Sequence, residues 1–281
     1  RKQAREQWEK PRAWERDDNA TLQPKSERVV VLGGDITGSV MTSMFKDRFP
    51  DRFFSIGIAE QNATTIATGL AASGKIPFFA SYGAFCALRN ADQLRISVCY
   101  NESNVKIGGG HSGISVGPDG ATHQILEDIG MMRMLPGMTV INPCDYNQTK
   151  AATIAIADHD GPVYLRFGRP KVANFTPADQ KFEIGKALHL QDGKDVTIVA
   201  TGHLVWEALE AAKVLNEKGI SAEVINIHTI KPLDSEAVIK SVKKTGCIVT
   251  AEEHNYLGGL DHCFFSDQAR GDSRLLSTID K

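Results

Sequence analysis

The sequence lacks any long hydrophobic run and any segment with the pattern of a secretory signal. Its longest apolar runs, such as 28–32 and 196–200, have the length of strands, whereas a membrane-spanning helix needs about 20 apolar residues. The N-terminal residues are charged and include two tryptophans, which does not suit a signal peptide. We therefore expect neither a secretory leader nor contact with a membrane.

The sequence also lacks a surplus of charge and any clustered cysteines. A formal net charge of -2 gives no reason to expect binding to nucleic acid, and no basic stripe is present. The five cysteines form no Cys-x-x-Cys pair and lie far apart, at Cys86, Cys99, Cys144, Cys247 and Cys263. Neither a disulfide framework nor a zinc site is indicated, and a reducing, cytoplasmic setting is the simplest expectation.

What is present is a regular alternation of strand and helix patterns. Apolar runs rich in β-branched and aromatic residues lie at 29–32, 53–56, 76–79, 105–107, 139–141 and 163–167. Helical stretches separate them, including 63–73 and one that follows Asp145, a good N-cap residue. Strands that alternate with helices predict a mostly parallel sheet covered on both faces.

A break in this alternation divides the chain. Residues 169–185 contain prolines and a polar run, which is typical of a linker. After the linker the alternation restarts, with strands expected at 196–201, 223–227 and 247–251 and helices at 204–218 and 235–244. The sequence predicts an α/β protein of two domains, 28–168 and 186–281, each a mostly parallel sheet flanked by helices. Residues 1–27 are charged and aperiodic, and we interpret them as an N-terminal arm of unclear structure.

The run Gly57-Ile58-Ala59-Glu60-Gln61-Asn62 carries the first candidate site residue. It lies between an apolar strand and the helical run 63–73, which places Glu60 at a strand-to-helix junction, shielded from water. Desolvation disfavours the charged form of a carboxyl group, so Glu60 could hold a proton against a ring nitrogen of a bound cofactor. The alternative is a helix N-terminal acid stabilised by the macrodipole.

A second motif is Gly117-Pro118-Asp119-Gly120-Ala121-Thr122-His123-Gln124, whose Gly and Pro residues predict a loop. A helix over 125–134 should follow and offer its N-terminus to an anion. His123 would lie beside Asp119, and His111 follows three glycines, where backbone can approach a ligand closely. Two histidines and an acid suit hydrogen bonds to sugar hydroxyls and proton transfer near neutral pH, although each histidine alone could be a surface imidazole.

Two further features follow strand ends. Tyr82 and Phe85 could stack on a flat heteroaromatic ring or pack into the core. Arg169 could bind a phosphate through two N–H groups or form an interdomain salt bridge.

Taken in order along the chain, these motifs resemble the pyrimidine-binding domain of transketolase. The resemblance rests on the Glu60 run, on the Asp119-Gly120-x-Thr122-His123-Gln124 loop, and on two strings, Arg89-Asn90-Ala91-Asp92-Gln93-Leu94-Arg95 and Glu127-Asp128. Ile230-Lys231-Pro232-Leu233-Asp234, Glu252-Glu253-His254 and Gly258-Gly259-Leu260 resemble the C-terminal domain of the same family. The resemblance covers roughly residues 28–260.

The resemblance implies transfer of a two-carbon ketol unit between sugar phosphates, with thiamine diphosphate as cofactor. It implies that Glu60 contacts the aminopyrimidine and activates the cofactor, with Tyr82 and Phe85 packed on the ring and Asp35 near the pocket. It also implies a substrate channel in which His111 and His123 act near the reacting groups. The sugar hydroxyls and phosphate would be bound by His111, Asp119, His123 and Arg169.

One family hallmark is missing from this chain. Transketolase-like enzymes hold the diphosphate and Mg²⁺ with a Gly-Asp-Gly sequence and a downstream Asn, which Gly33-Gly34-Asp35-Ile36 does not match. We therefore expect no metal ligands here, and an N-terminal subunit that holds the diphosphate and Mg²⁺ (or Ca²⁺) in an α2β2 assembly. The chain alone should bind cofactor weakly and be inactive. Residues 261–281 depart from the family, which leaves the completeness of the second domain open.

Two alternatives stay open. A 1-deoxy-D-xylulose-5-phosphate synthase-like enzyme shares the glutamate motif and the Asp-Gly-x-Thr-His-Gln loop, but typically has an arginine-containing segment where this chain has His111. A non-catalytic assembly subunit would explain the unusual termini, whereas Glu60, His111, Asp119 and His123 argue against it.

Overall fold

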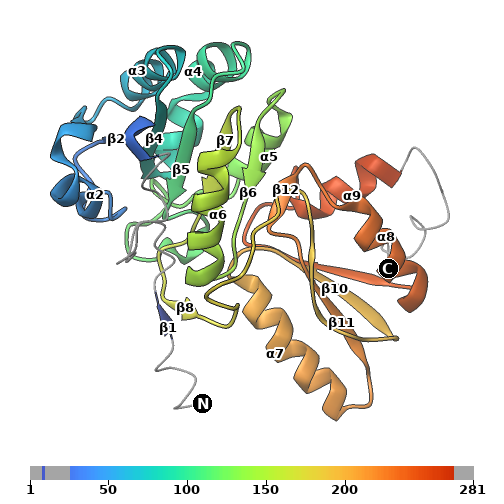
Figure 1. Cartoon of the computed structure of the whole chain (residues 1–281). Helices are drawn as coiled ribbons and strands as arrows, with labels where there is room; N and C mark the ends of the chain where they lie inside the picture. The colour runs from blue at the N-terminus through green and yellow to red at the C-terminus, as the bar shows by residue number, and fades with distance from the viewer. Residues whose placement is uncertain (1–7, 10–25, 269–281) are drawn as a thin grey trace.

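The computed structural model describes residues 8–9 and 26–268, so most of the predicted arm and residues 269–281 lie outside the described residues. In the described part, the chain forms a seven-stranded sheet, a four-stranded sheet and a two-stranded pair. The seven-stranded sheet and the four-stranded sheet lie side by side, each with helices packed on it (Figure 1). The predicted α/β fold with two mostly parallel sheets is confirmed.

The first sheet has the strand order β12-β6-β7-β5-β4-β2-β3. All pairings between its first six strands along the chain are parallel. These strands are β2 (Val29–Gly33), β3 (Phe53–Ser55), β4 (Ile76–Tyr82), β5 (Lys106–Gly110), β6 (Thr139–Ile141) and β7 (Val163–Arg166). Because carboxyl ends of parallel strands share one edge, the loops after β2, β3, β4, β5 and β7 meet there.

Helices of several kinds connect these strands. The α-helices are α2 (Ser43–Arg48), α3 (Glu60–Ala72), α4 (Ala91–Gln93), α5 (Asp128–Met134) and α6 (Tyr146–Asp158). Three short 3₁₀ helices are described as well, η1 (Ser26–Arg28), η2 (Pro50–Arg52) and η5 (Ile114–Val116). After β4 the chain forms two π-helical stretches, η3 (Phe85–Arg89) and η4 (Leu94–Cys99). Such turns are rare and occur often at functional sites.

The second sheet has the order β13-β10-β11-β9. Its strands are β9 (Leu188–Gln191), β10 (Val196–Ala200), β11 (Ala222–Asn226) and β13 (Ile248–Ala251). The helices of this half are α7 (Leu204–Glu217), α8 (Ser235–Thr245) and α9 (Leu260–Gln268). Strand β10 runs parallel to both β11 and β13, whereas β9 pairs antiparallel with β11.

Capping residues define helix ends as the sequence indicates. The side chain of Asp145 accepts a 2.8 Å hydrogen bond from the backbone N–H of Gln148 at the start of α6, which confirms the predicted N-cap. Asp234 caps α8 in the same way through the N–H of Ala237. Helix α8 ends at Thr245 and is followed by its C-cap Gly246, whose φ of 81° is a conformation that glycine adopts without strain.

Three features differ from the sequence-based expectation. The helix predicted over 125–134 begins at Asp128, because Ile125 instead forms an antiparallel bridge with Gly113. The strands β9 and β12 (Thr229–Lys231) were not predicted, and β12 leaves the second half of the chain to pair antiparallel with β6. Within the predicted arm, β1 (Trp8–Glu9) pairs with β8 (Val172–Ala173).

One hydrophobic cluster joins the two halves. It contains Leu32 and Phe79 from the first sheet together with Ile225 and Leu260 from the second half, all of them buried. Shared burial of this kind holds the two halves in a fixed relation. None of the described helices is long and apolar enough to cross a membrane.

Candidate cofactor and substrate site

The predicted site residues collect at the carboxyl edge of the first sheet. Glu60 is the first residue of α3, just after β3, and Tyr82 is the last residue of β4. Phe85 opens the π-helical stretch η3, and His111 follows β5 directly. The parallel topology therefore brings these four side chains to one edge of the sheet, although up to 51 residues separate them in the chain.

Glu60 is paired with an arginine for which the sequence assigned no role. The carboxyl group of Glu60 is largely buried, and its Oε2 lies 2.7 Å from Nη1 of Arg89. The guanidinium carbon of Arg89 lies 4.2 Å from the centre of the Phe85 ring, a cation–π distance. Gln61 adds a 2.9 Å hydrogen bond from Nε2 to the carbonyl oxygen of Arg89. The guanidinium thus lies between a carboxylate and an aromatic face.

Two aromatic and two histidine rings form a continuous cluster next to this pair. Tyr82 stacks on His111 with ring centres 4.3 Å apart and 27° between the ring planes. His123 meets both Tyr82 and Phe85 edge-on, at 5.5 and 5.3 Å. Tyr82 and Phe85 are only partly buried, so their rings line a surface instead of filling a core. We call Tyr82, Phe85, His111 and His123 the ring cluster.

The backbone at His111 has a conformation that L-residues rarely adopt. Its φ is 55°, in the left-handed region, and the residue is buried. Strained backbone of this kind is retained where surrounding structure holds it, often at functional sites. The three glycines before it have a packing role. A Cβ on Gly109 would overlap the Tyr164 side chain, and one on Gly110 would press on Phe167. At Gly109 and Gly110 the space that a side chain would need is thus filled by Tyr164 and Phe167.

The segment 113–126, which we call the site loop, carries Asp119 and His123. Arg169, which is not part of the loop, makes two contacts with it. Its Nη1 donates a 2.8 Å hydrogen bond to the carbonyl oxygen of Val116 and lies 3.2 Å from Oδ1 of Asp119. The Oγ1 of Thr122 lies 2.8 Å from Nδ1 of His123, a hydrogen bond that restricts the imidazole. The salt bridge of Arg169 is therefore made within the site, to Asp119.

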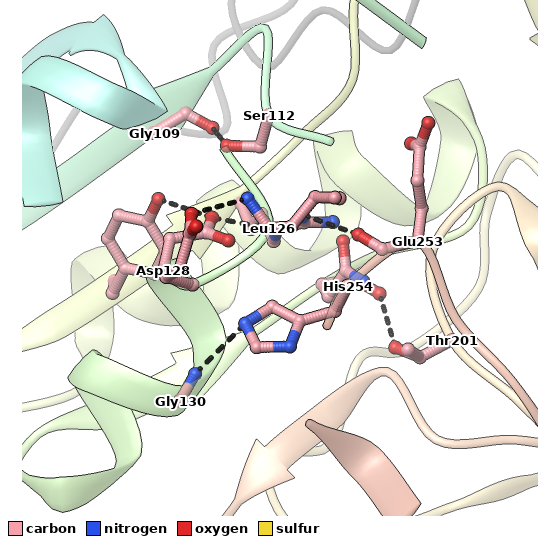
Figure 2. A network of polar contacts seen from close by, with 12 residues as sticks. Gly109, Ser112, Leu126, Asp128, Gly130, Thr201, Glu253 and His254 are labelled. Atoms are coloured by element: carbon pink, nitrogen blue, oxygen red, sulfur yellow. Dashed lines mark hydrogen bonds and ion pairs between the residues drawn. The ribbon is translucent and has the colours of Figure 1, made fainter. Parts of the chain in front are cut away.

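A buried polar cluster lies just after the site loop, at the start of α5. Oδ2 of Asp128 accepts hydrogen bonds from Nε of Arg166 at 2.8 Å and from the hydroxyl of Tyr164 at 2.9 Å. Burial by itself would raise the pKa of Asp128, but the Arg166 guanidinium and the Tyr164 hydroxyl outweigh it and hold that pKa below its usual range. In Figure 2, Asp128 lies beside Leu126 at the end of the site loop.

Asp35 stands apart from the ring cluster. It is exposed after β2, at the same edge of the sheet, and its neighbour Gly34 comes close to the carbonyl oxygen of Gly57. Within the described residues, Asp35 makes no hydrogen bond or ion pair with the other predicted site residues. The edge of the sheet brings together Glu60, Tyr82, Phe85 and His111, the site loop adds Asp119 and His123, and Arg169 is bonded to Asp119.

Two residues that contact this region were not singled out from the sequence. Arg89 lies four residues after Phe85, and the signal for it was the burial of Glu60, since a buried carboxylate needs a cation or several donors. Glu253 touches the site loop from the second half of the chain, through Ser115. That contact spans 138 positions, and no local pattern indicates it.

A group with metal-ligand spacing lies elsewhere, on the second sheet. In the described parts of the chain, ligand atoms of His189, Asp192 and Glu223 lie within 4.8 Å of one another. The ammonium group of Lys244 lies 2.6 Å from Oε2 of Glu223 and supplies the positive charge there. We interpret this group as a network of ion pairs.

Comparisons with known proteins agree with this geometry. The sequence profile for the transketolase pyrimidine-binding domain matches residues 12–174, and that for the transketolase C-terminal domain matches 185–265. A 6-deoxy-6-sulfo-D-fructose transketolase subunit of Clostridium sp. (strain MSTE9) is 46% identical over 84% of this chain and 73% of its own length. One of the subunits of an apulose-4-phosphate transketolase, from Phocaeicola vulgatus, is 41% identical over 85% of this chain and 77% of its own length.

A solved structure extends the likeness to three dimensions. A split-gene transketolase, described as an inactive beta4 tetramer, matches with a TM-score of 0.82 at 43% identity, covering 89% of this chain and 82% of that one. The two profiles fall on the two halves that carry the first and second sheets. The chain therefore belongs to the transketolase family and corresponds to its pyrimidine-binding and C-terminal domains.

Proposed function

We propose that this chain is the C-terminal subunit of a two-chain transketolase that transfers a two-carbon ketol unit between sugar phosphates. The observation that carries the proposal is the arrangement of Glu60 beside the ring cluster. A largely buried carboxylate, two partly exposed aromatic rings and two histidines lie at the carboxyl edge of a parallel sheet. That edge is where α/β proteins bind their ligands.

The residues present suit the pyrimidine half of thiamine diphosphate. The guanidinium of Arg89 is a planar group with N–H donors, and it stacks on Phe85 while it donates to Glu60. An aminopyrimidine ring is also planar and offers nitrogen atoms to a carboxyl group, so it could make the same two contacts. When bound, thiamine diphosphate supplies the nucleophilic carbon and the electron sink that carbon–carbon cleavage next to a carbonyl requires.

The chain's own residues would then have separate roles. Glu60 would form a hydrogen bond with a ring nitrogen of the cofactor, the role that the family resemblance implies for it. Tyr82 and Phe85 would fix the plane of the ring, with Asp35 near the pocket. His111 and His123 would donate hydrogen bonds to the substrate and move protons at its hydroxyl and carbonyl oxygens, for which an imidazole is suited near neutral pH.

Asp119 and Arg169 would bind the rest of the sugar phosphate. Both contacts of Arg169 described above use Nη1, whereas a guanidinium carries five N–H donors. Arg169 could therefore grip a phosphate while it holds the site loop. Asp119 would accept a hydrogen bond from a sugar hydroxyl.

The diphosphate and its Mg²⁺ would be held mainly by an N-terminal subunit, in an α2β2 assembly. The relatives that are named as subunits support this division. The described cysteines are free thiols, which supports a reducing compartment such as the cytoplasm.

A coupled assay tests the proposal. The purified chain is combined with a diphosphate-binding chain, thiamine diphosphate and Mg²⁺, and offered xylulose 5-phosphate with ribose 5-phosphate. We expect ketol transfer by the mixture and none by this chain alone. Turnover of pyruvate with glyceraldehyde 3-phosphate instead would show the synthase-like reaction. Since relatives are named for a sulfo-fructose and for apulose 4-phosphate, these two ketoses are tested as donors in parallel.

A further inference from the structure

The segment 252–259, which follows β13 in the second half of the chain, lies directly against the site loop of the first half. It leaves the carboxyl end of β13, where Glu252 and Glu253 are the first residues after the strand. Figure 2 shows the ring of His254 pointing toward Gly130, with Glu253 next to His254 along the chain. The carboxyl edge of the second sheet therefore faces the site, although none of its residues belongs to the ring cluster.

Glu253 holds the first part of the site loop. Its Oε1 accepts a 2.5 Å hydrogen bond from the backbone N–H of Ser115, and its Oε2 accepts a 3.0 Å bond from the Ser115 hydroxyl. Nε2 of His203 lies 2.9 Å from the same Oε2, and only a tenth of the Glu253 side chain is exposed. Burial would raise the pKa of Glu253, but the His203 imidazole and the two Ser115 donors hold it below its usual range.

The site loop leaves space for the Glu253 carboxylate at Gly113. Gly113 has a φ of 89°, a conformation that other L-residues rarely adopt. A Cβ on Gly113 would also overlap the carboxylate of Glu253, so the side chain fills the space that the glycine leaves. The missing side chain of Gly113 thus leaves the space that the Glu253 carboxylate occupies.

Neighbours of Glu253 hold the other end of the loop and the helix α5 that follows it. The N–H of Asn255 donates a 2.8 Å hydrogen bond to the carbonyl oxygen of Leu126. The N–H of Gly130 donates to Nε2 of His254 at 3.2 Å, as the dashed line in Figure 2 marks. The bridge between Gly113 and Ile125 closes the loop between these two anchors. Asp119 and His123 lie between them.

We propose that Glu253 is a positioning residue for the site: it fixes the site loop, and through it the orientation of His123 and Asp119 toward the substrate. Glu253 does not itself touch the ring cluster, and its effect passes through Ser115 and Gly113. The second half of the chain would then set the geometry of the substrate-binding groups in addition to stabilising the fold. The catalytic consequence rests on the proposed function, whereas the positioning of the loop does not.

The positioning itself is tested on the full chain alone. Glu253→Gln and Glu253→Ala are compared with Glu223→Gln, a matched control, because Glu223 is also a buried carboxylate of the second half with a histidine 2.6 Å away. Amide hydrogen exchange and the imidazole resonances of His111 and His123 are measured. These imidazoles lie against Tyr82 and Phe85, whose rings shift their resonances. A loop that moves would change that shift.

In the Glu253 variants we expect exchange over 113–126 to rise about tenfold and the His123 resonance to lose its ring-induced shift. We expect neither change in Glu223→Gln. Unchanged loop exchange and an unchanged His123 resonance in Glu253→Ala would overturn the proposal, as would equal changes in Glu223→Gln.

A second pair of variants tests the contact between Glu253 and Gly113 by stability alone. Gly113→Ala is made alone and together with Glu253→Ala, and the midpoint of thermal unfolding is measured for each. We expect the double variant to be more stable than the sum of the single effects, because removal of the carboxylate relieves the overlap at residue 113. Strict additivity would show that the two residues do not interact and would overturn the proposal.

In the assembled enzyme, Glu253→Gln should lower kcat/KM for the sugar phosphates by about 10- to 100-fold, while the Kd of thiamine diphosphate stays unchanged. A loss of cofactor affinity equal to the loss of kcat/KM would contradict a role through the site loop. If the wild-type assembly has no ketol-transfer activity, the proposed function fails, while the exchange and resonance measurements on the free chain still decide the positioning.

Discussion

Arg89 donates a 2.7 Å hydrogen bond from Nη1 to Oε2 of Glu60, and these two residues define one end of the candidate site. The pair joins η3 to the start of α3 across 29 positions of sequence. Because the guanidinium also stacks on Phe85, it occupies the space between the carboxylate and an aromatic face. A flat ring that binds to Glu60 through this space has to displace the guanidinium.

Replacement of Glu60 tests the cofactor role. In the assembled enzyme, Glu60→Gln should lower kcat by about 10²- to 10⁴-fold, because an amide cannot hold and release the proton. Glu217→Gln, at the exposed end of α7, serves as the control and should leave kcat unchanged. Steady-state kinetics with xylulose 5-phosphate make the measurement. Full activity in Glu60→Gln would instead support an assembly-only subunit.

A double-mutant cycle measures the coupling between Arg89 and Glu60 in the free chain. Arg89→Ala should lower the free energy of unfolding by about 1 kcal/mol, because it leaves a buried carboxylate without its cation. The figure is small because 43% of the Arg89 side chain is exposed. Adding Glu60→Gln should restore most of the loss. Urea unfolding is the measurement, with Arg95→Ala, an exposed arginine of η4, as control. An Arg89→Ala effect that the second change leaves intact would argue against the coupling.

Arg169 is expected to affect the binding of the phosphate more than the chemistry. In Arg169→Gln, the KM for a phosphorylated ketose should rise about 10- to 100-fold with a smaller change in kcat, since a charge-assisted bond to the phosphate is lost. The KM for an unphosphorylated ketose should change far less, because it lacks the phosphate. Lys171→Gln, two residues away and exposed, is the control. Equal losses for both kinds of ketose would show that Arg169 acts only by holding the site loop.

The buried pair of Asp128 and Arg166 should dominate the acid stability of the first half of the chain. Asp128→Asn should lower the free energy of unfolding by about 3–5 kcal/mol, because it leaves the Arg166 guanidinium buried without its counter-charge. The pKa of Asp128 is lower in the folded chain than in the unfolded chain, so its contribution is complete above about pH 4 and is lost as the pH falls further. Urea unfolding at pH 7 measures the effect of Asp128→Asn, and unfolding at about pH 2 shows the loss of the wild-type contribution at low pH. Glu127→Gln, on the exposed neighbour, should change neither.

Lys106 should make stability rise with pH on the alkaline side. It is buried in β5, and burial lowers its pKa to about 7, although its Nζ donates to the carbonyl oxygens of His159 and Gly161. Between pH 7 and about 10 the unfolded chain therefore binds one proton more than the folded chain. The free energy of unfolding gains up to about 1.4 kcal/mol per pH unit in this range.

Lys106→Met removes this pH dependence. Between pH 7 and pH 9 the free energy of unfolding of the wild type should therefore rise relative to that of the variant. Denaturant unfolding at the two pH values gives the difference. Lys75→Met, on an exposed lysine, should keep the slope of the wild type. A wild-type slope in Lys106→Met would mean that the lysine stays protonated in the folded chain.

Much of the fold could be predicted because its determinants are local. Strand and helix patterns alternate along the chain, and Asp145 marks the start of α6 by its own hydrogen bond to the helix end. The parallel order then placed Glu60, Tyr82 and His111 at one edge, since each lies at or just after the carboxyl end of a strand. The expected start of α5 was wrong, because the bridge of Ile125 to Gly113 is a contact that no helix pattern records.

The sequence by itself therefore determined the α/β alternation, the family, and the seven residues that the sheet and the site loop bring together. Only the tertiary structure decided which residues hold them in place. Arg89 is bonded to Glu60, Arg169 to Asp119, and Glu253 to the site loop. The tertiary structure alone also showed that β12 pairs with β6 of the first sheet. The physical reason is that these contacts join segments up to 138 positions apart, where partners are selected by packing and by the need to satisfy buried charges.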